Sequence, residues 1–359
     1  MKTSLILLIA LATIPAWADE VREKRLRSID AKVLAEMKKQ DVVGVAIGLI
    51  DAAGVSYLNG YGFADREAKI PVTQDTMFRW ASISKSVTAV AAMQLWESGQ
   101  LSLGDDVRRY VPEFPKRRAP VTIEQLLSHQ GGIVHYTNGR IVRSRRLYHV
   151  PNPHGHVTLA LDTLRESHLV NAPGQKYSYS TRGYILLSAA IERAGQQRFA
   201  DQVEQRISRP LLLTTLQPDY QWRDIPNRTK GYLRRNGRIV ESTDTDVSWK
   251  LGGGGYISTI GDLAKFGAGL MNNEILHPDT KKRMWTVEHA PEGKKVNYAL
   301  GFKVSGEGRS LEVSHSGSQE KTKTILIIYP NQGHGVAVMC NTHHADPNAF
   351  ARAVLSVSE

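Results

Sequence analysis

A serine three residues ahead of a lysine is the arrangement in this chain that most directly suggests covalent chemistry. Ser82 and Lys85 form this pair at the start of an apolar segment. A serine hydroxyl attacks a carbonyl when a neighbouring group removes its proton. A lysine amine can do so if burial or a nearby positive charge lowers its pKa. The alternative is ordinary: Ser82 as a helix N-cap and Lys85 as a surface lysine.

The same spacing occurs a second time, at Ser318 and Lys321, in a different context. That pair lies next to a predicted strand, where residues i and i+3 point to opposite faces and do not meet. Ser82 instead begins residues 82–98, whose apolar pattern predicts a buried helix. Residues i and i+3 of a helix share a face, and the helix N-terminus adds a positive dipole. The sequence therefore predicts that Lys85 reaches the hydroxyl of Ser82.

Two further motifs follow the serine-lysine pair along the chain. Tyr179-Ser180-Thr181 precedes an apolar helical run, and His315-Ser316-Gly317-Ser318 precedes a predicted hairpin. With Ser82 and Lys85, this set resembles the serine β-lactamase and penicillin-binding-protein-like superfamily. Within it, the chain looks most like the class C branch, and there like the mitochondrial β-lactamase-like serine protease and its bacterial relatives. Other stretches carry the same resemblance: residues 78–81, 110–114, 126–129, 254–259 and 262–263.

The resemblance implies an acyl-enzyme mechanism at named positions. Ser82 would attack a carbonyl, while Lys85 and Tyr179 share the proton transfers, with the principal base left open. The backbone N–H groups of Ser82 and Ser318 would form the oxyanion hole. Gly317 would leave room for the close approach of substrate.

Two departures from the family pattern bear on the substrate. Thr181 stands where class C enzymes usually carry asparagine, and a hydroxyl has one donor where an amide has two. His315 stands where they carry lysine, and histidine is largely neutral at pH 7. Both positions are predicted substrate contacts. If a protonated His315 held an anionic substrate, activity on carboxylates would rise between about pH 7 and 6.

The pattern of elements predicts an α/β (α+β) fold, and the resemblance implies that this fold is of the β-lactamase/transpeptidase type. An antiparallel sheet built from both chain ends is flanked by helices, with a helical region inserted. We expect a single catalytic domain over residues 19–359, with its α/β part at about 19–75 and 255–359 and its helical part at about 76–254. The predicted strands are residues 42–50, 55–61, 324–329 and 336–340. The predicted helices are residues 20–39, 82–98, 122–128, 183–194, 261–271 and 347–357.

The first eighteen residues predict a cleavable secretory signal. Lys2 precedes the apolar run Leu5–Leu11, and Ala16-Trp17-Ala18 fits a cleavage site after Ala18. The alternative is a membrane anchor, but the run is shorter than the roughly 20 residues that a span requires. We therefore expect a secreted or periplasmic protein with no integral membrane span after cleavage.

Composition and charge indicate which kinds of partner and cofactor the protein is not expected to bind. The chain of 359 residues has a formal net charge of +11, but its arginine cluster at residues 140–146 lacks the aromatic pattern of a nucleic-acid binder. The single cysteine, Cys340, excludes an internal disulfide. No metal or cofactor is implied, because the spacing of His135, His149, His154 and His156 matches no zinc motif.

Two functions follow from these features. The first is an exported serine hydrolase that cleaves amide or ester bonds of a small molecule or peptide, with cell-wall peptides among the candidates. The departures at Thr181 and His315 favour this over efficient hydrolysis of β-lactam antibiotics. The alternative is a non-catalytic module of the same fold that binds a cell-wall peptide or a protein partner. The sequence leaves the oligomeric state open.

Overall fold

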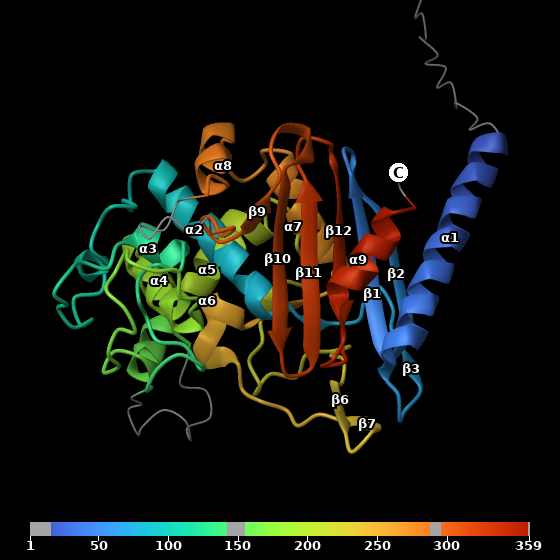
Figure 1. The fold of residues 1–359 in the computed structure, drawn as a ribbon, viewed down its shortest axis with the longest axis horizontal. Helices are drawn as coiled ribbons and strands as arrows, with labels where there is room; N and C mark the ends of the chain where they lie inside the picture. The colour runs from blue at the N-terminus through green and yellow to red at the C-terminus, as the bar shows by residue number, and fades with distance from the viewer. Residues whose placement is uncertain (1–15, 142–154, 288–295, 358–359) are drawn as a thin grey trace, which may run out of the picture.

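A seven-stranded antiparallel sheet forms one half of the molecule (Figure 1). The structure, a computed structural model, describes residues 16–141, 155–287 and 296–357. The strand order is β3-β2-β1-β12-β11-β10-β9. In chain order the strands are β1 (Gly44–Asp51), β2 (Gly54–Asp65), β3 (Ile70–Pro71), β9 (Lys303–Ser305), β10 (Glu312–Gln319), β11 (Thr322–Tyr329) and β12 (His334–Cys340).

The sheet joins the two ends of the chain, as the sequence predicts. Strand β1 pairs with β12, with Ile47 opposite Val338, so an N-terminal hairpin and a C-terminal hairpin share one ladder. All seven residues from Gly44 to Ile50 are buried. A strand that is apolar on both faces must be covered on both sides, so its sequence already requires helices above and below it.

Helices cover the two faces of this sheet. On one face lie α1 (Ala16–Gln40) and α9 (Pro347–Leu355), where Ile29, Val33 and Phe350 are fully buried. On the other face lies α7 (Ile260–Met271). Gly267 of α7 permits close packing, because a Cβ there would lie 2.7 Å from a methyl of Ile50 on β1. Cys340, on β12, is buried in the α1–α9 core.

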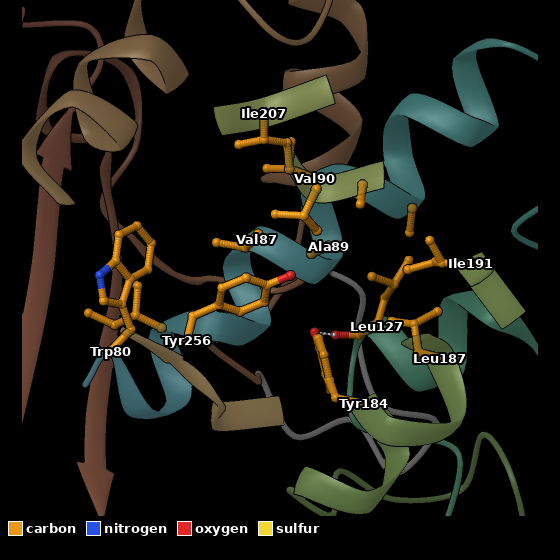
Figure 2. Close-up of a cluster of buried hydrophobic side chains, with 14 of the residues drawn as sticks. Trp80, Val87, Ala89, Val90, Leu127, Tyr184, Leu187, Ile191, Ile207 and Tyr256 are labelled. Carbon is orange, nitrogen blue, oxygen red and sulfur yellow. Dashed lines mark hydrogen bonds between the residues drawn. The ribbon is translucent and has the colours of Figure 1, made fainter. Parts of the chain in front are cut away.

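The second half of the molecule is mostly helical and is inserted between β3 and β9 (Figure 1). Helix α2 (Ser84–Glu97) runs through its middle, and residues Ser84–Met93 are all buried. Its neighbours are α3 (Ile123–Leu127), α4 (Thr181–Ala194), α5 (Phe199–Val203), α6 (Leu251–Gly254) and α8 (Pro278–Met284). Figure 2 shows the core around α2, where the Tyr184 hydroxyl donates to the carbonyl of Leu127 at 2.7 Å.

Short strands and helical turns complete this half. Strands β4 (Phe78–Arg79), β8 (Tyr256–Ser258) and β5 (Gln217–Pro218) form a small sheet in the order β4-β8-β5. Strands β6 (Tyr232–Arg235) and β7 (Arg238–Glu241) form a separate hairpin. The helical turns are η1 (Ala81–Ile83), η2 (Val107–Arg109), η3 (Val157–Thr163), η4 (Glu204–Ser208), η5 (Ser248–Lys250) and η6 (Gly308–Ser310).

The predicted fold class is confirmed, and the differences are local. Ser82 does not begin the α-helix, since it lies in the 3₁₀ turn η1 and α2 starts at Ser84. A 3₁₀ turn places residues i and i+3 directly above one another, so the predicted pairing with Lys85 is preserved. Within the described residues, no helix is long and apolar enough to cross a membrane. The predicted signal segment lies largely outside the described residues.

Candidate active site

The segment that precedes Ser82 is held in place on both sides. Trp80 donates through its backbone N–H to Tyr256 at 2.8 Å and through Nε1 to the Ser258 hydroxyl at 2.6 Å. From the opposite side, Thr322 and Thr324 of β11 donate their hydroxyls to the carbonyls of Arg79 and Trp80, both at 3.0 Å. Strands β8 and β11 therefore fix the backbone that leads to Ser82.

Ala81, the residue before Ser82, has a backbone conformation that alanine rarely adopts. Its φ is +49°, in the left-handed region, and its side chain is buried. Such a conformation costs about 1–3 kcal/mol and persists only where the surroundings enforce it. Here the enforcing groups are the hydrogen bonds at Trp80 and the packing of β10 against η1.

Lys85 is fully buried and its ammonium faces three oxygens. Its Nζ lies 3.2 Å from the Ser82 hydroxyl, 3.1 Å from the Thr181 hydroxyl and 2.6 Å from the Gly253 carbonyl. Burial lowers the pKa of Lys85 well below its ordinary 10.5, and the positive charge of Lys250 lowers it further. The predicted Ser82–Lys85 pair is therefore present, and the environment favours the neutral amine.

The neutral form of Lys85 suits the role of a base. The Gly253 carbonyl can only accept, so it takes one N–H of Lys85, and the Thr181 hydroxyl can accept a second. A neutral amine has two N–H groups and one lone pair, so the lone pair is left for the O–H of Ser82. Neither η1 nor α2 has a side-chain N-cap, which removes the capping role as an explanation of Ser82.

Tyr179 lies beside the lysine, as predicted. The centroid of its ring is 4.8 Å from Lys85 Nζ. Burial raises the pKa of Tyr179 above its ordinary 10, and a hydrogen bond with the Ser82 side chain opposes this effect only in part. The phenol is therefore protonated at neutral pH and can donate a proton.

Thr181 is drawn into the site by the start of α4. The Ser180 side chain caps this helix by accepting from the Gly183 N–H at 3.0 Å. Thr181 then lies in the first turn, with its hydroxyl on Lys85 and its N–H donating to His135 Nδ1 at 3.2 Å. The structure thus places Thr181 where it orients the lysine.

Gly317 lies on β10 at the point where this strand passes the nucleophile. A Cβ on Gly317 would lie 2.4 Å from the Trp80 carbonyl and 2.9 Å from the Ala81 Cβ. Contacts this short are incompatible with any side chain, because the facing segment is fixed backbone. Glycine is therefore required for β10 to approach η1.

The N–H of Ser318 points to the open edge of the sheet. A two-residue turn joins Gln319 to Thr322, and the closing pair of such a hairpin exchanges both backbone hydrogen bonds. Hydrogen-bonded pairs alternate along an antiparallel ladder, which directs the Ser318 N–H away from β11. Strand β9 pairs with β10 only as far as Ser314. The Ser318 N–H is therefore oriented so that it can donate a hydrogen bond to an oxyanion.

The side chain of Ser318 has a different partner from the one its spacing suggests. It is exposed and accepts from Lys323 Nζ at 2.6 Å, while Lys321 pairs with Asp244 at 3.0 Å. As the sequence predicts, the second serine-lysine match brings no such pair together.

His315 is present at the site but cannot carry the charge considered for it. Its Nδ1 faces the Ser316 carbonyl at 2.8 Å and its Nε2 faces the Tyr298 hydroxyl at 2.9 Å. Burial, reinforced by the charge of Lys85, lowers the pKa of His315 to about 3. The idea of a protonated His315 near pH 6 is therefore wrong, because a neutral ring that donates from Nδ1 and accepts at Nε2 satisfies both partners.

Because His315 stays neutral, activity on anionic substrates should show no pH dependence that comes from this residue. We expect the ratio of kcat/KM for a carboxylate substrate to that for its neutral analogue to stay constant between about pH 7 and 6, where an ordinary histidine gains its proton. The measurement is a pair of pH–rate profiles on stable protein. A ratio that rises several-fold on acidification would show that His315 titrates in this range.

Two other groups around the site, His129 and Lys250, were assigned no catalytic role from the sequence. The His129 ring packs 4.2 Å from Tyr179 and 4.7 Å from Tyr298, and its Nδ1 accepts from the Ser180 N–H at 3.2 Å. Lys250 influences the pKa of Lys85 from η5. The only sequence signal for Lys250 is its place before the glycine run 252–255.

The histidines considered for a metal are not gathered in the described part of the chain. His135 accepts from Thr181, and His156 lies 3.4 Å from Glu192. His149 and His154 lie outside the described residues. Among the described residues, no group of three or more histidine, cysteine, aspartate or glutamate side chains is placed to hold a metal ion.

Comparisons with known proteins show the family to which this sequence is similar. The sequence profile of the beta-lactamase family matches residues 29–358. The mitochondrial serine beta-lactamase-like protein of Homo sapiens is 27% identical, over 86% of this chain and 75% of the relative. Penicillin-binding protein 4* of Bacillus subtilis is 24% identical, over 86% of this chain and 70% of the relative.

Solved structures share the fold. The octameric penicillin-binding protein homologue from Pyrococcus abyssi superposes with a TM-score of 0.78 at 25% identity, covering 93% of this chain and 77% of that one. The D-amino acid amidase from Ochrobactrum anthropi gives 0.77 at 21% identity, covering 92% and 98%. The hydrolase EstCE1 gives 0.79 at 20% identity, covering 96% and 100%. At these last two identities, the likeness concerns the fold alone.

Proposed function

The chain belongs to the beta-lactamase family, and we propose that it is a serine hydrolase that cleaves amide or ester bonds through an acyl-enzyme on Ser82. The observation that carries this proposal is the fully buried Lys85, whose Nζ lies 3.2 Å from the Ser82 hydroxyl and whose pKa is strongly lowered. The family includes serine hydrolases, and named amidase and hydrolase structures share the fold. Membership of the class C branch stays a prediction.

The first chemical step would be attack by Ser82. Lys85 takes the hydroxyl proton on its lone pair while Oγ forms a bond to the carbonyl carbon, and the π electrons move onto the carbonyl oxygen. The N–H groups of Ser82 and Ser318 would receive the developing oxyanion, which is the interaction that stabilises the transition state most.

The leaving group then needs a proton. The phenol of Tyr179 would donate it as the carbon–heteroatom bond breaks, and the ammonium of Lys85 would return a proton to the phenolate. The Ser82 hydroxyl supports this exchange, because it hydrogen-bonds to the Tyr179 side chain and lies 3.2 Å from Lys85 Nζ. In deacylation a water molecule would attack the acyl carbonyl and the same two groups would act in reverse. On this proposal Lys85 is the principal base.

The proposed substrate class follows from Thr181 and His315, the two motif positions that depart from the family pattern. The Thr181 hydroxyl serves Lys85, and the neutral His315 serves Tyr298 and its own strand, so neither supplies the contacts expected for a β-lactam. We therefore favour peptides, amides or esters as substrates. The protein would be exported through a signal cut after Ala18, leaving a single catalytic domain over residues 19–359.

A non-catalytic binding module is the less favoured alternative. A module of that kind has no use for a buried amine with a lowered pKa, since burying an ionisable amine costs stability. The cost is explained if the amine acts as a base.

Covalent labelling tests the proposed function directly. Mature protein treated with a fluorophosphonate probe should gain one probe mass, and peptide mapping should place the adduct on Ser82. A panel of p-nitrophenyl esters, D- and L-peptide amides and a chromogenic cephalosporin should then give turnover, with esters or amides above the cephalosporin. An unlabelled Ser82, or an adduct on another residue with no turnover, would overturn the proposal.

A further inference from the structure

His129 lies just after helix α3, at a turn position where glycine is the usual residue. The Gln130 N–H donates to the Gln125 carbonyl at 2.7 Å, and the His129 N–H donates to the Leu126 carbonyl at 3.4 Å. This pair of hydrogen bonds is a common way for a helix to end, and it places one residue in the left-handed region. Here that residue is His129, with a φ of +59°. A side chain in this conformation strains the backbone and glycine avoids the strain, so the imidazole ring needs an explanation of its own.

His129 contacts three consecutive residues, and the middle one is Tyr179. The Ser178 N–H donates to the His129 carbonyl at 2.7 Å, and the Ser180 N–H donates to His129 Nδ1 at 3.2 Å. Between these two hydrogen bonds, the centroid of the Tyr179 ring lies 4.2 Å from that of the His129 ring. One histidine therefore holds the backbone on both sides of Tyr179 and packs against the ring that carries the phenol.

The hydrogen bonds of the His129 ring exclude it from the role of a base. Because Nδ1 accepts from the Ser180 N–H, the ring proton is on Nε2. His129 is 2% exposed, and Nε2 has no hydrogen-bond partner among the described residues. Burial lowers the pKa of His129 well below its ordinary 6.5, and the positive charge of Lys85 lowers it further. A neutral ring whose only lone pair is occupied takes up no proton, so its contribution is to the position of Tyr179.

Protonation of the leaving group is the step that depends most on where Tyr179 lies. As the carbon–heteroatom bond breaks, its electron pair moves to the leaving atom, which takes the phenolic proton, and the ammonium of Lys85 returns a proton to the phenolate. Amines and alkoxides need this proton, whereas 4-nitrophenolate is stable as an anion and leaves without it. A displacement of about 1 Å at such a step can slow the reaction by roughly 100-fold.

We propose that His129 is a positioning residue that holds Tyr179 where it can protonate poor leaving groups, and that the substrates are therefore amides and alkyl esters. The inference rests on the proposed hydrolase function and narrows its substrate class to acyl compounds whose leaving group needs a proton. The contacts of His129 with Ser178, Tyr179 and Ser180 carry it. An enzyme that acted only on activated esters would gain nothing from a phenol held in this way.

Three esters of one acid isolate the leaving group. The butyrates of 4-nitrophenol, phenol and benzyl alcohol form the same acyl-enzyme and differ in how much the leaving group needs a proton. Because kcat/KM includes the steps up to acylation and none after it, it reports on the departure of the leaving group. Wild-type protein should hydrolyse all three esters.

Variants of His129 should change the dependence on the leaving group. His129→Leu offers no acceptor to the Ser180 N–H, so it should lower kcat/KM for benzyl butyrate by roughly 10- to 100-fold and change that for 4-nitrophenyl butyrate little. His129→Asn should recover most of the loss, because its Oδ1 takes the place of Nδ1 and asparagine adopts the left-handed conformation readily. His129→Gln moves the acceptor one bond further and should resemble His129→Leu, so it supplies the test if the leucine variant does not fold.

A double variant shows whether His129 acts through Tyr179. Tyr179→Phe alone should lower kcat/KM for benzyl butyrate by about 10²- to 10⁴-fold, the contribution of a positioned general acid. In that background the added His129→Leu should lower kcat/KM little further, because the proton whose position it controls is absent. A histidine that only stabilised the fold would lower both enzymes by the same factor.

Tyr184→Phe is the matched structural control. The Tyr184 ring lies 5.0 Å from the His129 ring, and its buried hydroxyl donates to the Leu127 carbonyl at 2.7 Å. The variant should lower the melting temperature, because it removes the donor from a buried carbonyl. The ratio of kcat/KM for the benzyl ester to that for the 4-nitrophenyl ester should match the wild type.

The outcomes separate this inference from the proposed function. Equal losses on the three esters in His129→Leu, a full further loss in the Tyr179→Phe background, or no recovery in His129→Asn would overturn the positioning role. Wild-type protein that labels on Ser82 and hydrolyses 4-nitrophenyl butyrate, but neither benzyl butyrate nor N-benzylbutyramide, would overturn the substrate class and leave the hydrolase standing. Absence of both labelling and turnover would overturn the hydrolase and this inference together.

Discussion

Replacing Ser82 with alanine is expected to abolish covalent labelling and to lower kcat/KM by at least about 1000-fold, because no other group can form the acyl-enzyme. The loss should appear in acylation itself, measured as the rate of ester cleavage under single-turnover conditions and as the probe adduct by intact mass. The fold should persist, since Lys85 keeps the acceptors Thr181 and Gly253.

The control for this variant comes from the C-terminal end of α2, the helix that follows Ser82. Ser98 is exposed and its hydroxyl donates to the Leu95 carbonyl at 3.1 Å, away from the site. Ser98→Ala should label and turn over like the wild type. Labelling of Ser82→Ala at the wild-type rate would show that the nucleophile is a different residue.

Removing the amine of Lys85 is the second change with a large expected effect. Lys85→Ala should slow acylation by about 10²- to 10⁴-fold, the contribution of a positioned general base. In the wild type the base must be neutral, so kcat/KM should fall as the pH drops through the lowered pKa of Lys85. In Lys85→Ala, which lacks the amine, this fall in kcat/KM at low pH should disappear. Stopped-flow acylation across the pH range measures both effects.

Two variants sharpen the interpretation of this result. Lys85→Arg keeps a positive charge but cannot supply a neutral base, because guanidinium stays protonated in proteins, so it should be as slow as Lys85→Ala. Lys321→Ala removes the lysine of the second serine-lysine match, which pairs with Asp244, and should acylate normally. Fast acylation by Lys85→Ala would assign the base role to another group.

The fold could be anticipated largely because its signals are local. Continuous apolar runs such as residues 44–50 and 324–328 require a sheet covered on both faces, and the spacing of Ile29 and Val33 marks the covering helix. The start of the catalytic helix was less predictable. Ser82 lies in a 3₁₀ turn because Trp80 and Ala81 are held by β8 and β11, strands remote in sequence.

Some features of the site likewise follow from residues close together in the sequence, and others follow from residues that only the fold brings together. The pairing of Ser82 with Lys85 depends on three residues of spacing and a helical turn, so the sequence predicts it. The protonation of His315 depends on Tyr298 and on burial by distant segments. A histidine pKa near 6.5 was the only value available from sequence, and burial moved it to about 3.

The sequence by itself determined which residues could do covalent chemistry and which elements carry them, because motif spacing and apolar periodicity act over a few residues. Only the tertiary structure decided their electrostatic states. Lys85 acquires a lowered pKa from total burial and from Lys250, which is 165 positions away in the chain. Desolvation and Coulomb interaction depend on distances in space, so no local pattern of residues encodes them.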